Sequence, residues 1–264
     1  MKKNISILII SFIFVLSCFS DTITGIVKTS TGQLVNDASV SIFKLPEGQK
    51  PLKTGVSTKD GKFKFDGLET GYYKIVASKK GFCDGILFRI EVNQPKYGIV
   101  NYEIVLNKPG SISGFVYDPD GKPVSGAKVF KSDNKYAITD SRGFYKIGGL
   151  NPGSHYIGAE CSGYVKDYKS CVVEEEKETQ GINFTLSFGG SIKGTVIDFD
   201  TKKPVKDARV ECSGAIYSSS KTDEKGNFFI DGLPQGNYNL YVYRQGYEFA
   251  QIGKIIGVKV KETF

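Results

Sequence analysis

The sequence predicts an all-β protein in which three tandem antiparallel β-sandwiches follow an N-terminal signal peptide. One block of residues occurs three times, at 57–73, 139–155 and 222–238. The copies begin 82 and 83 residues apart, and a recurrence at a nearly fixed period indicates a repeat architecture. Within each copy, apolar and polar residues alternate with a period of two, which is typical of half-buried strands.

Each copy of the block is predicted to form two strands joined by tight turns. It begins with a polar turn that ends in glycine, which adopts a positive φ without steric cost. An alternating run follows, then a Gly-Leu-x-x-Gly turn, then a second alternating run that ends at a Gly-aromatic pair. This spacing leaves no room for a long helix. The inward residues of the second runs are Tyr73/Ile75/Ala77, His155/Ile157/Ala159 and Tyr238/Leu240/Val242.

Each repeat opens with an Ile-x-Gly-x-Val strand, and the first two repeats end with a closing strand. The closing strands are expected at residues 99–106 and 182–186. Nothing similar follows in repeat 3, whose last strand is apparently missing. Either the sequence is shortened, or an unpaired edge remains that another chain can pair with. The predicted domains are repeat 1 at residues 23–107, repeat 2 at 111–187 and repeat 3 at 191–264.

The first residues are typical of a bacterial export signal. A positively charged start precedes the apolar stretch Ile5–Leu16, which is too short for a comfortable membrane span. The stretch Val15–Cys18 resembles the lipobox of bacterial lipoproteins, in which the cysteine is lipidated and becomes the first residue. Residues 1–17 are therefore expected to be a lipoprotein signal peptide. The alternative is an ordinary signal peptide cut after Ser17 or Ser20.

Lipidation at Cys18 implies an exported protein anchored in the membrane of the bacterial cell envelope, facing the periplasm or the cell surface. Stable retention needs two or three acyl chains, because one chain anchors only weakly. Residues 18–22 form the anchor segment, so the first domain is expected to lie close to the membrane.

Several motifs of the repeats together resemble a known family. The second strand of repeat 2 lies in Pro123–Val129 (P-V-S-G-A-K-V), and the T-D-x-x-G-x-F block and the terminal G-Y pair accompany it. This set resembles carboxypeptidase regulatory-like domains, which belong to the transthyretin-like sandwiches together with collagen-adhesin B-type repeats and starch-binding-like modules. The resemblance covers residues 23–264 and implies three transthyretin-like sandwiches. Members serve as stalks, adhesin spacers, accessory domains and carbohydrate binders, so it does not fix a function.

Composition and residue inventory argue against catalysis and nucleic-acid binding. The net charge of +7 includes two leader lysines, and acidic and basic residues are interspersed, which favours a solvated surface. The one histidine, His155, falls on an inward position, where a structural role is expected. Two-carboxylate turns such as Asp118/Asp120 supply too few ligands for calcium. The protein is predicted to be no enzyme and to need no cofactor or metal.

Four cysteines follow the leader, and two of them flank one turn. Cys161 and Cys171 lie on either side of Gly163, on strands expected to be adjacent. An exported chain permits a disulfide there, whereas two independent buried thiols are the equal alternative. Cys212 is expected in the core, and the role of Cys83 is not readable from the sequence.

The B-type adhesin repeats often form an isopeptide bond, for which the family needs a glutamate on the strand after G-x-Y. This chain has Ala77, Ala159 and Val242 at that position, and Glu160 is one residue off. Neighbouring residues of a strand point to opposite faces. No isopeptide bonds are therefore predicted.

Tyr241 and Tyr243 lie two positions apart on one strand of repeat 3 and are expected to share its outer face. Such a pair is a possible stacking platform for a sugar ring. The leading prediction is a non-catalytic cell-envelope lipoprotein that acts as a spacer or protein-interaction module. The alternatives are a carbohydrate-binding module that uses this pair, or accessory domains of a larger enzyme. The expected partners are the membrane, reached through the lipid, and an envelope protein or polysaccharide.

Overall fold

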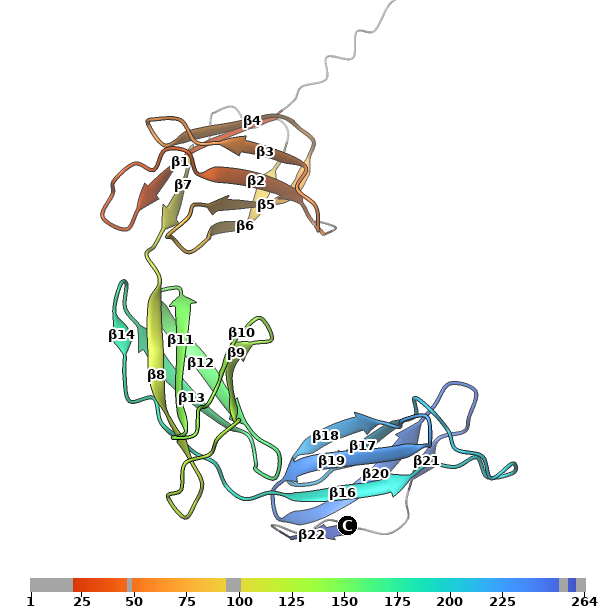
Figure 1. Cartoon of the computed structure of the whole chain (residues 1–264). Helices are drawn as coiled ribbons and strands as arrows, with labels where there is room; N and C mark the ends of the chain where they lie inside the picture. Colours follow the sequence, from red (N-terminus) through yellow and green to blue (C-terminus); the bar gives the residue numbers. More distant parts are fainter. Residues whose placement is uncertain (1–20, 47–48, 94–100, 252–255, 260–264) are drawn as a thin grey trace, which may run out of the picture. The chain divides into compact units, whose positions relative to one another are not determined.

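A computed structural model describes residues 21–46, 49–93, 101–251 and 256–259, which contain β-strands and no α-helix (Figure 1). The predicted signal peptide and the predicted lipidation site Cys18 lie outside the described residues. Within the described part of the chain, no helix is long and apolar enough to span a membrane. The chain divides into two compact units, residues 1–107 and 108–264, of which the first holds repeat 1 and the second holds repeats 2 and 3.

Repeat 1 is a sandwich of a three-stranded sheet, β4-β1-β7, and a four-stranded sheet, β3-β2-β5-β6. The closing strand β7 runs parallel to β1, so the repeat ends beside the strand with which it begins. Buried residues of both sheets form one core, which includes Val27, Ile42, Phe63 and Ile75. The strands are β1 (Asp21–Thr29), β2 (Ser39–Lys44), β3 (Lys53–Val56), β4 (Lys62–Leu68), β5 (Gly71–Ser78), β6 (Gly85–Val92) and β7 (Asn101–Leu106).

Repeat 2 has the same architecture. One sheet has the order β11-β8-β14, with β15 also pairing with β8, and the other has the order β10-β9-β12-β13. The short strands β14 and β15 are both parallel to β8 and together take the place of β7. The strands are β8 (Gly110–Tyr117), β9 (Lys128–Ser132), β10 (Lys135–Ile138), β11 (Phe144–Leu150), β12 (Gly153–Glu160), β13 (Asp167–Val173), β14 (Glu178–Thr179) and β15 (Phe184–Thr185).

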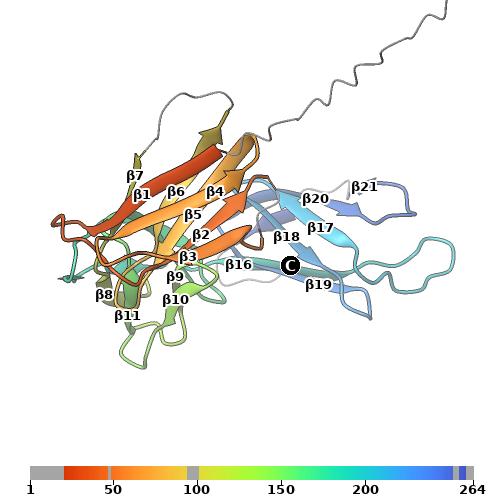
Figure 2. The ribbon, with the colours of Figure 1, turned by 90° about the horizontal axis from the view of Figure 1, so that it is seen from above.

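Repeat 3 departs from the other two. Its first sheet contains only β16 and β19 among the described residues, and the two lie side by side in Figures 1 and 2. Its second sheet has the order β18-β17-β20-β21, with β22 also pairing with β20. The strands are β16 (Gly190–Thr195), β17 (Arg209–Ser213), β18 (Tyr217–Lys221), β19 (Asn227–Leu233), β20 (Gly236–Tyr243), β21 (Ala250–Gln251) and β22 (Ile256–Val258).

One buried hydroxyl recurs in all three repeats at the first residue of the block. In repeat 2, Thr139 Oγ1 donates to the carbonyl of Val124 at 2.7 Å and accepts the amide of Ala127 at 2.8 Å. Ser57 binds Val35 and Ala38 in the same way, and Thr222 binds Val205 and Ala208. The hydroxyl thus satisfies two backbone groups inside the sandwich. Sequence reasoning placed this residue in a polar turn and missed its role.

Candidate interaction surfaces on repeats 2 and 3

Tyr241 and Tyr243 lie on the outer face of β20, and a third ring joins them. Phe249 stacks on Tyr241 with ring centroids 5.9 Å apart, and it packs against Tyr243 at 5.1 Å. Tyr243 is 42% exposed and Phe249 is 56% exposed, so apolar ring surface faces solvent. The sequence prediction omitted Phe249, although it follows the Gly246-Tyr247 turn that leads back toward the strand. We call Tyr241, Tyr243 and Phe249 the repeat-3 platform.

Polar groups border the repeat-3 platform. A cavity of about 270 Å³ is lined by Asp207, Tyr243, Arg244, Gln245, Tyr247 and Phe249. On the neighbouring strand β17, Arg209 lies opposite Tyr243 and Glu211 opposite Tyr241. The Arg209 Nε atom pairs with Glu211 Oε1 at 2.7 Å. Rings that offer stacking surface beside hydrogen-bonding side chains are the chemistry that a sugar or an extended peptide needs.

A second aromatic surface lies on the outer face of repeat 2, and sequence reasoning missed it. Tyr156 and Tyr168 stack with centroids 5.2 Å apart and planes only 2° apart, and Phe130 meets Tyr168 edge-on at 6.2 Å. Gly158 lies between these rings in the ladder. A Cβ there would come within 2.6 Å of Phe130 and 2.8 Å of Tyr168, so glycine is what lets the rings approach. The sequence did offer one signal for this surface, because Tyr156 falls at an outward position of β12, between the inward residues His155 and Ile157.

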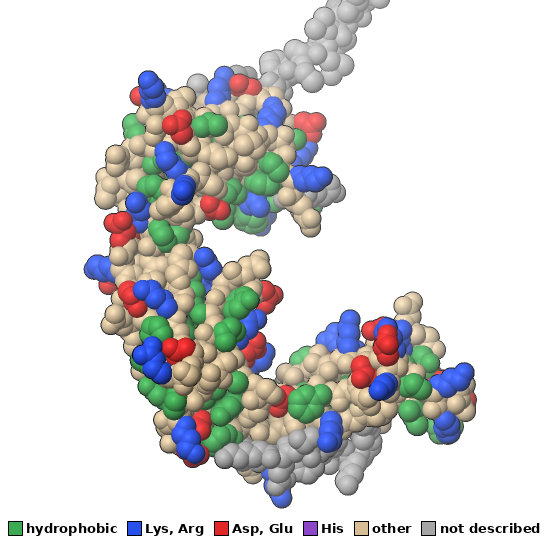
Figure 3. Space-filling model, in the orientation of Figure 1, with side chains coloured by type: hydrophobic (Ala, Val, Ile, Leu, Met, Phe, Trp, Pro, Cys, Tyr) green, Lys and Arg blue, Asp and Glu red, His purple; other side chains and the backbone are tan. Residues whose placement is uncertain are grey.

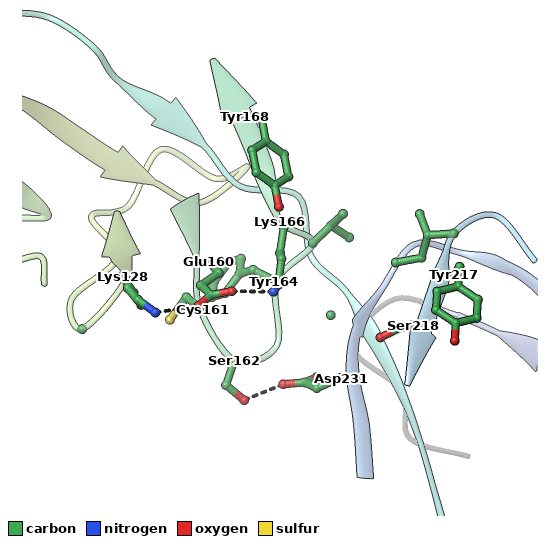
Figure 4. A pocket seen from close by; sticks show the side chains of 14 residues that line it. Lys128, Glu160, Cys161, Ser162, Tyr164, Lys166, Tyr168, Tyr217, Ser218 and Asp231 are labelled. Atoms are coloured by element: carbon green, nitrogen blue, oxygen red, sulfur yellow. Dashed lines mark hydrogen bonds and ion pairs between the residues drawn. The ribbon is translucent and has the colours of Figure 1, made fainter. Parts of the chain in front are cut away.

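A pocket of about 700 Å³ lies inside the second unit, where repeat 2 meets repeat 3 (Figure 4). Glu160 on its wall pairs with Lys166 at 2.5 Å and with Lys128 at 3.7 Å. Tyr168 of the repeat-2 aromatic surface also lines it, as does Tyr217 of repeat 3. The wall therefore combines aromatic side chains with charges of both signs.

The joint between repeats 2 and 3 is built from specific hydrogen bonds (Figure 4). Asp231 Oδ2 accepts Ser162 Oγ at 2.6 Å and the Gly163 amide at 2.9 Å. The Gly189 amide of the linker donates to the Gly163 carbonyl at 2.8 Å. A Cβ on Gly232 would come within 2.5 Å of the Tyr164 carbonyl oxygen, so the two backbones approach closely there.

The disulfide considered for Cys161 and Cys171 is wrong for this fold. Cys171 lies opposite His155 in the β12–β13 ladder, whereas Cys161 follows the last residue of β12. Six positions along a strand correspond to roughly 20 Å, and a disulfide needs Cα atoms within about 7 Å. Neither cysteine forms a disulfide with another described cysteine, and the same holds for Cys83 and Cys212. Burial raises the pKa of Cys161, Cys171 and Cys212, which keeps these thiols protonated and weakly reactive.

The aspartates in the turns after the opening strands of repeats 2 and 3 accept hydrogen bonds from backbone amides. Asp118 Oδ1 accepts the amides of Asp120 and Lys122, and Asp198 Oδ1 accepts those of Asp200 and Thr201. Among the described residues, no group of three or more potential ligands could hold a metal ion. On the face drawn in Figure 3, acidic and basic side chains are interspersed without a run of one sign.

The chain belongs to the carboxypeptidase regulatory-like domain family, whose model matches residues 22–103, 111–187 and 191–261. The three matches correspond to the three sandwiches of the structure. The family resemblance and the all-β fold predicted from the sequence are thereby confirmed.

Curated relatives come from staphylococci. The serine-aspartate repeat-containing protein D of Staphylococcus aureus (strain Newman) is 26% identical, over 77% of this chain and 20% of that protein. The serine-aspartate repeat-containing protein F of Staphylococcus epidermidis is 27% identical, over 75% of this chain and 13% of that protein. The chain thus spans about one fifth or less of the length of these relatives.

Two solved pilin structures are also similar. The minor pilin of Streptococcus agalactiae has a TM-score of 0.36 and 14% identity, covering 63% of this chain and 95% of its own. The major pilin subunit of Bacillus cereus has a TM-score of 0.28 and 14% identity, covering 93% of this chain and 97% of its own. These TM-scores are low, and the family assignment rests on the sequence match alone.

Proposed function

We propose that this protein is a non-catalytic spacer and protein-interaction module of the bacterial cell envelope, exported and held at a membrane by lipid on Cys18. The observation that carries the spacer role is the joint at Asp231. Tandem domains on a flexible linker tumble independently, whereas a joint closed by backbone and side-chain hydrogen bonds resists bending. Tyr164 and Phe188 add a ring contact at 5.6 Å where the linker leaves repeat 2.

The joint can be tested by measuring whether repeats 2 and 3 align together in solution. Residual dipolar couplings on residues 21–264 are expected to fit one alignment tensor for both repeats, and two tensors in Asp231→Ala. Asp66→Ala is the matched control, because Asp66 holds the same place in the block of repeat 1 and binds Thr22 Oγ1 instead. Two tensors in the unaltered chain would refute a stiff spacer.

The anchor is tested by fractionating cells that express the full chain. Cys18→Ser is expected to move the protein from the membrane pellet to the soluble envelope or medium fraction. Cys83→Ser removes a thiol from repeat 1 and should leave the protein in the pellet. Unchanged membrane retention of Cys18→Ser would contradict the lipid anchor.

Carbohydrate binding by the repeat-3 platform is the second candidate function. The three adjoining rings and the polar cavity beside them favour it. A screen of envelope polysaccharides and glycans is expected to find a ligand whose binding Tyr241→Ala/Tyr243→Ala abolishes. Tyr156→Ala, an exposed tyrosine of repeat 2, is the control. Loss of binding in the control alone would move the site to the repeat-2 surface, and absence of any binding at millimolar ligand would remove this candidate.

A further inference from the structure

The outer face of the larger sheet in repeat 1 carries exposed apolar side chains. This sheet has the order β3-β2-β5-β6, and its inward residues lie in the core of the sandwich. On the outer face, Phe88 is 65% exposed, Ile86 is 58% exposed and Tyr72 is 44% exposed. Phe43 of β2 is half-buried on the same face, so the apolar side chains occupy three neighbouring strands (Figure 1). Large apolar side chains that gather on one face of a sheet mark an interaction surface.

Two basic side chains lie over the rings of this face. Lys74 Nζ lies 4.4 Å from the centre of the Phe43 ring. The guanidinium carbon of Arg89 lies 5.4 Å from the centre of the Tyr72 ring. Positive charge is attracted to the electron-rich face of an aromatic ring. Among the described outward positions of the sheet, Glu91 is the one acidic side chain, so the face combines apolar rings with an excess of positive charge.

A β-bulge in β6 brings a ring and a guanidinium together on this face. The pairing register of β5 with β6 shifts between Tyr73 and Ile75, and Arg89 on the facing strand has a φ of 56°. A bulge bends its strand and re-aims the side chains next to it. In a regular strand, Phe88 and Arg89 would point to opposite faces. Here both are exposed, and Arg89 reaches the ring of Tyr72 on the outer face.

The face begins at the end of the sandwich from which the chain leads back to the proposed anchor. Asp21, the first residue of β1, lies opposite Leu68, and β5 begins three residues later at Gly71. Tyr72 therefore lies at this end of the sandwich. Cys18 is three residues before Asp21, which corresponds to at most about 11 Å of extended chain. Lipid on Cys18 would therefore hold this end of repeat 1 at the headgroup region of the bilayer.

We propose that the outer face of β2, β5 and β6 docks on the surface of an anionic membrane. This repeat-1 face consists of four apolar and two basic residues, which are Phe43, Tyr72, Ile86, Phe88, Lys74 and Arg89. Its rings suit the interface between acyl chains and water, and its basic side chains are attracted to anionic headgroups. Nearness to the anchor and the excess of positive charge favour a lipid surface over a protein partner. The inference rests on the lipid anchor of the proposed function and adds a second contact to it, because one acyl chain alone anchors only weakly.

Tryptophan fluorescence tests this contact, because the chain contains no tryptophan of its own. Phe88→Trp is introduced into residues 21–264, which lack Cys18 and therefore measure the face without the anchor. Vesicles of phosphatidylcholine with phosphatidylglycerol are expected to shift its emission to the blue, and brominated acyl chains in such vesicles are expected to quench it. Adding Lys74→Gln and Arg89→Gln should weaken vesicle binding at least tenfold, because each basic residue near an anionic surface contributes about fivefold.

Tyr156→Trp in the same chain is the matched control. Tyr156 is 64% exposed on β12, the strand of repeat 2 that corresponds to β5. The emission of this control should stay at the wavelength of a water-exposed ring when vesicles are added. Vesicles of phosphatidylcholine alone, which lack anionic headgroups, should bind the Phe88→Trp chain at least tenfold more weakly.

Three results would overturn the proposal. The first is unshifted emission of the Phe88→Trp chain at millimolar lipid, or a shift that Tyr156→Trp shows equally. The second is vesicle binding that Lys74→Gln and Arg89→Gln leave unchanged. The third is a blue shift without vesicles that grows with protein concentration, which would make a second copy the occupant. A high-salt wash releases charge-based binding of the face, so salt-washed fractionation of Cys18→Ser decides the lipid anchor separately.

Discussion

The Nε2 atom of His155 lies 2.6 Å from the carbonyl oxygen of Asn151, four residues earlier. The same contact closes the Gly-Leu-x-x-Gly turn in the other repeats, where the Tyr73 hydroxyl donates to Glu69 at 2.8 Å and the Tyr238 hydroxyl to Pro234 at 3.0 Å. His155 is buried, as expected from its inward position. Its Nδ1 atom is the one buried side-chain polar atom among the described residues that lacks a hydrogen-bond partner.

His155→Tyr is expected to stabilise repeat 2 by about 1 kcal/mol, because a phenol keeps the turn contact and removes the unpaired nitrogen. Cys171 lies opposite His155, whereas the larger Ile90 lies opposite Tyr73, so the extra volume can be accommodated. His155→Phe should destabilise, since it leaves the Asn151 carbonyl without its bond. Urea unfolding of the three proteins measures both effects. Equal destabilisation by the two variants would contradict the view that Tyr73, His155 and Tyr238 play equivalent roles in the three turns.

Thr139→Val is expected to lower the free energy of unfolding of repeat 2 by about 1–3 kcal/mol. Valine has a similar shape, but it leaves the buried Val124 carbonyl and Ala127 amide unsatisfied. Thr139→Ser keeps the hydroxyl and should cost much less. Thr222→Val should behave in the same way in repeat 3. If the valine variants have the same free energy of unfolding as the serine variant, the hydroxyl's hydrogen bonds do not stabilise the sandwich.

Stability is expected to fall in acid partly through Asp140 and Asp223. The amide of Phe144 holds the pKa of Asp140 below its ordinary value of 3.8, and the amide of Asn227 does the same for Asp223. A depressed folded-state pKa contributes stability that is complete above the unfolded-state pKa and is lost as the pH falls through the folded-state pKa. Asp140→Asn and Asp223→Asn should therefore be less stable than the unaltered chain at neutral pH.

The difference should shrink as the pH falls below 3.8 and through the depressed folded-state pKa, because the aspartates are then protonated in both states. Thermal unfolding across this pH range measures it. Asp133→Asn, in the exposed β9–β10 hairpin, is the control and should show no such trend. A stability difference that stays constant with pH would show that the carboxylate charge is not involved.

The intact mass of the exported chain is expected to show no loss of ammonia or water from its repeats. Ala77 and Ala159 are fully buried, and Val242 is partly buried, at the place where the B-type adhesin resemblance implies a glutamate. Without that carboxyl, no side chain there can promote amide formation between a lysine and an asparagine or aspartate. Electrospray mass spectrometry decides this, and a deficit of 17 or 18 Da per domain, the mass of one ammonia or water, would refute it.

The strand pattern was readable from the sequence because burial alternates with a period of two. Phe63 and Phe65 are buried on β4, and Tyr145 and Ile147 occupy the same positions on β11, as the repeated block predicts. The outward residues were not readable in the same way, because their neighbours come from other strands. Tyr156 meets Tyr168 only through the β12–β13 register. The same register separates Cys161 from Cys171, and no spacing along the chain reveals it.

The parallel pairing of β1 with β7 has a mechanical consequence. Tension applied at Asp21 and Leu106 pulls these two strands past one another, so their six paired positions bear the load together rather than one after another. Force-driven unfolding is governed by the rate of strand separation. Repeat 1 should therefore resist stretching by optical tweezers better than repeat 2, where the parallel partners β14 and β15 pair with β8 at only two positions each. Under load repeat 2 would then unfold before repeat 1, which would limit the force that reaches repeat 1.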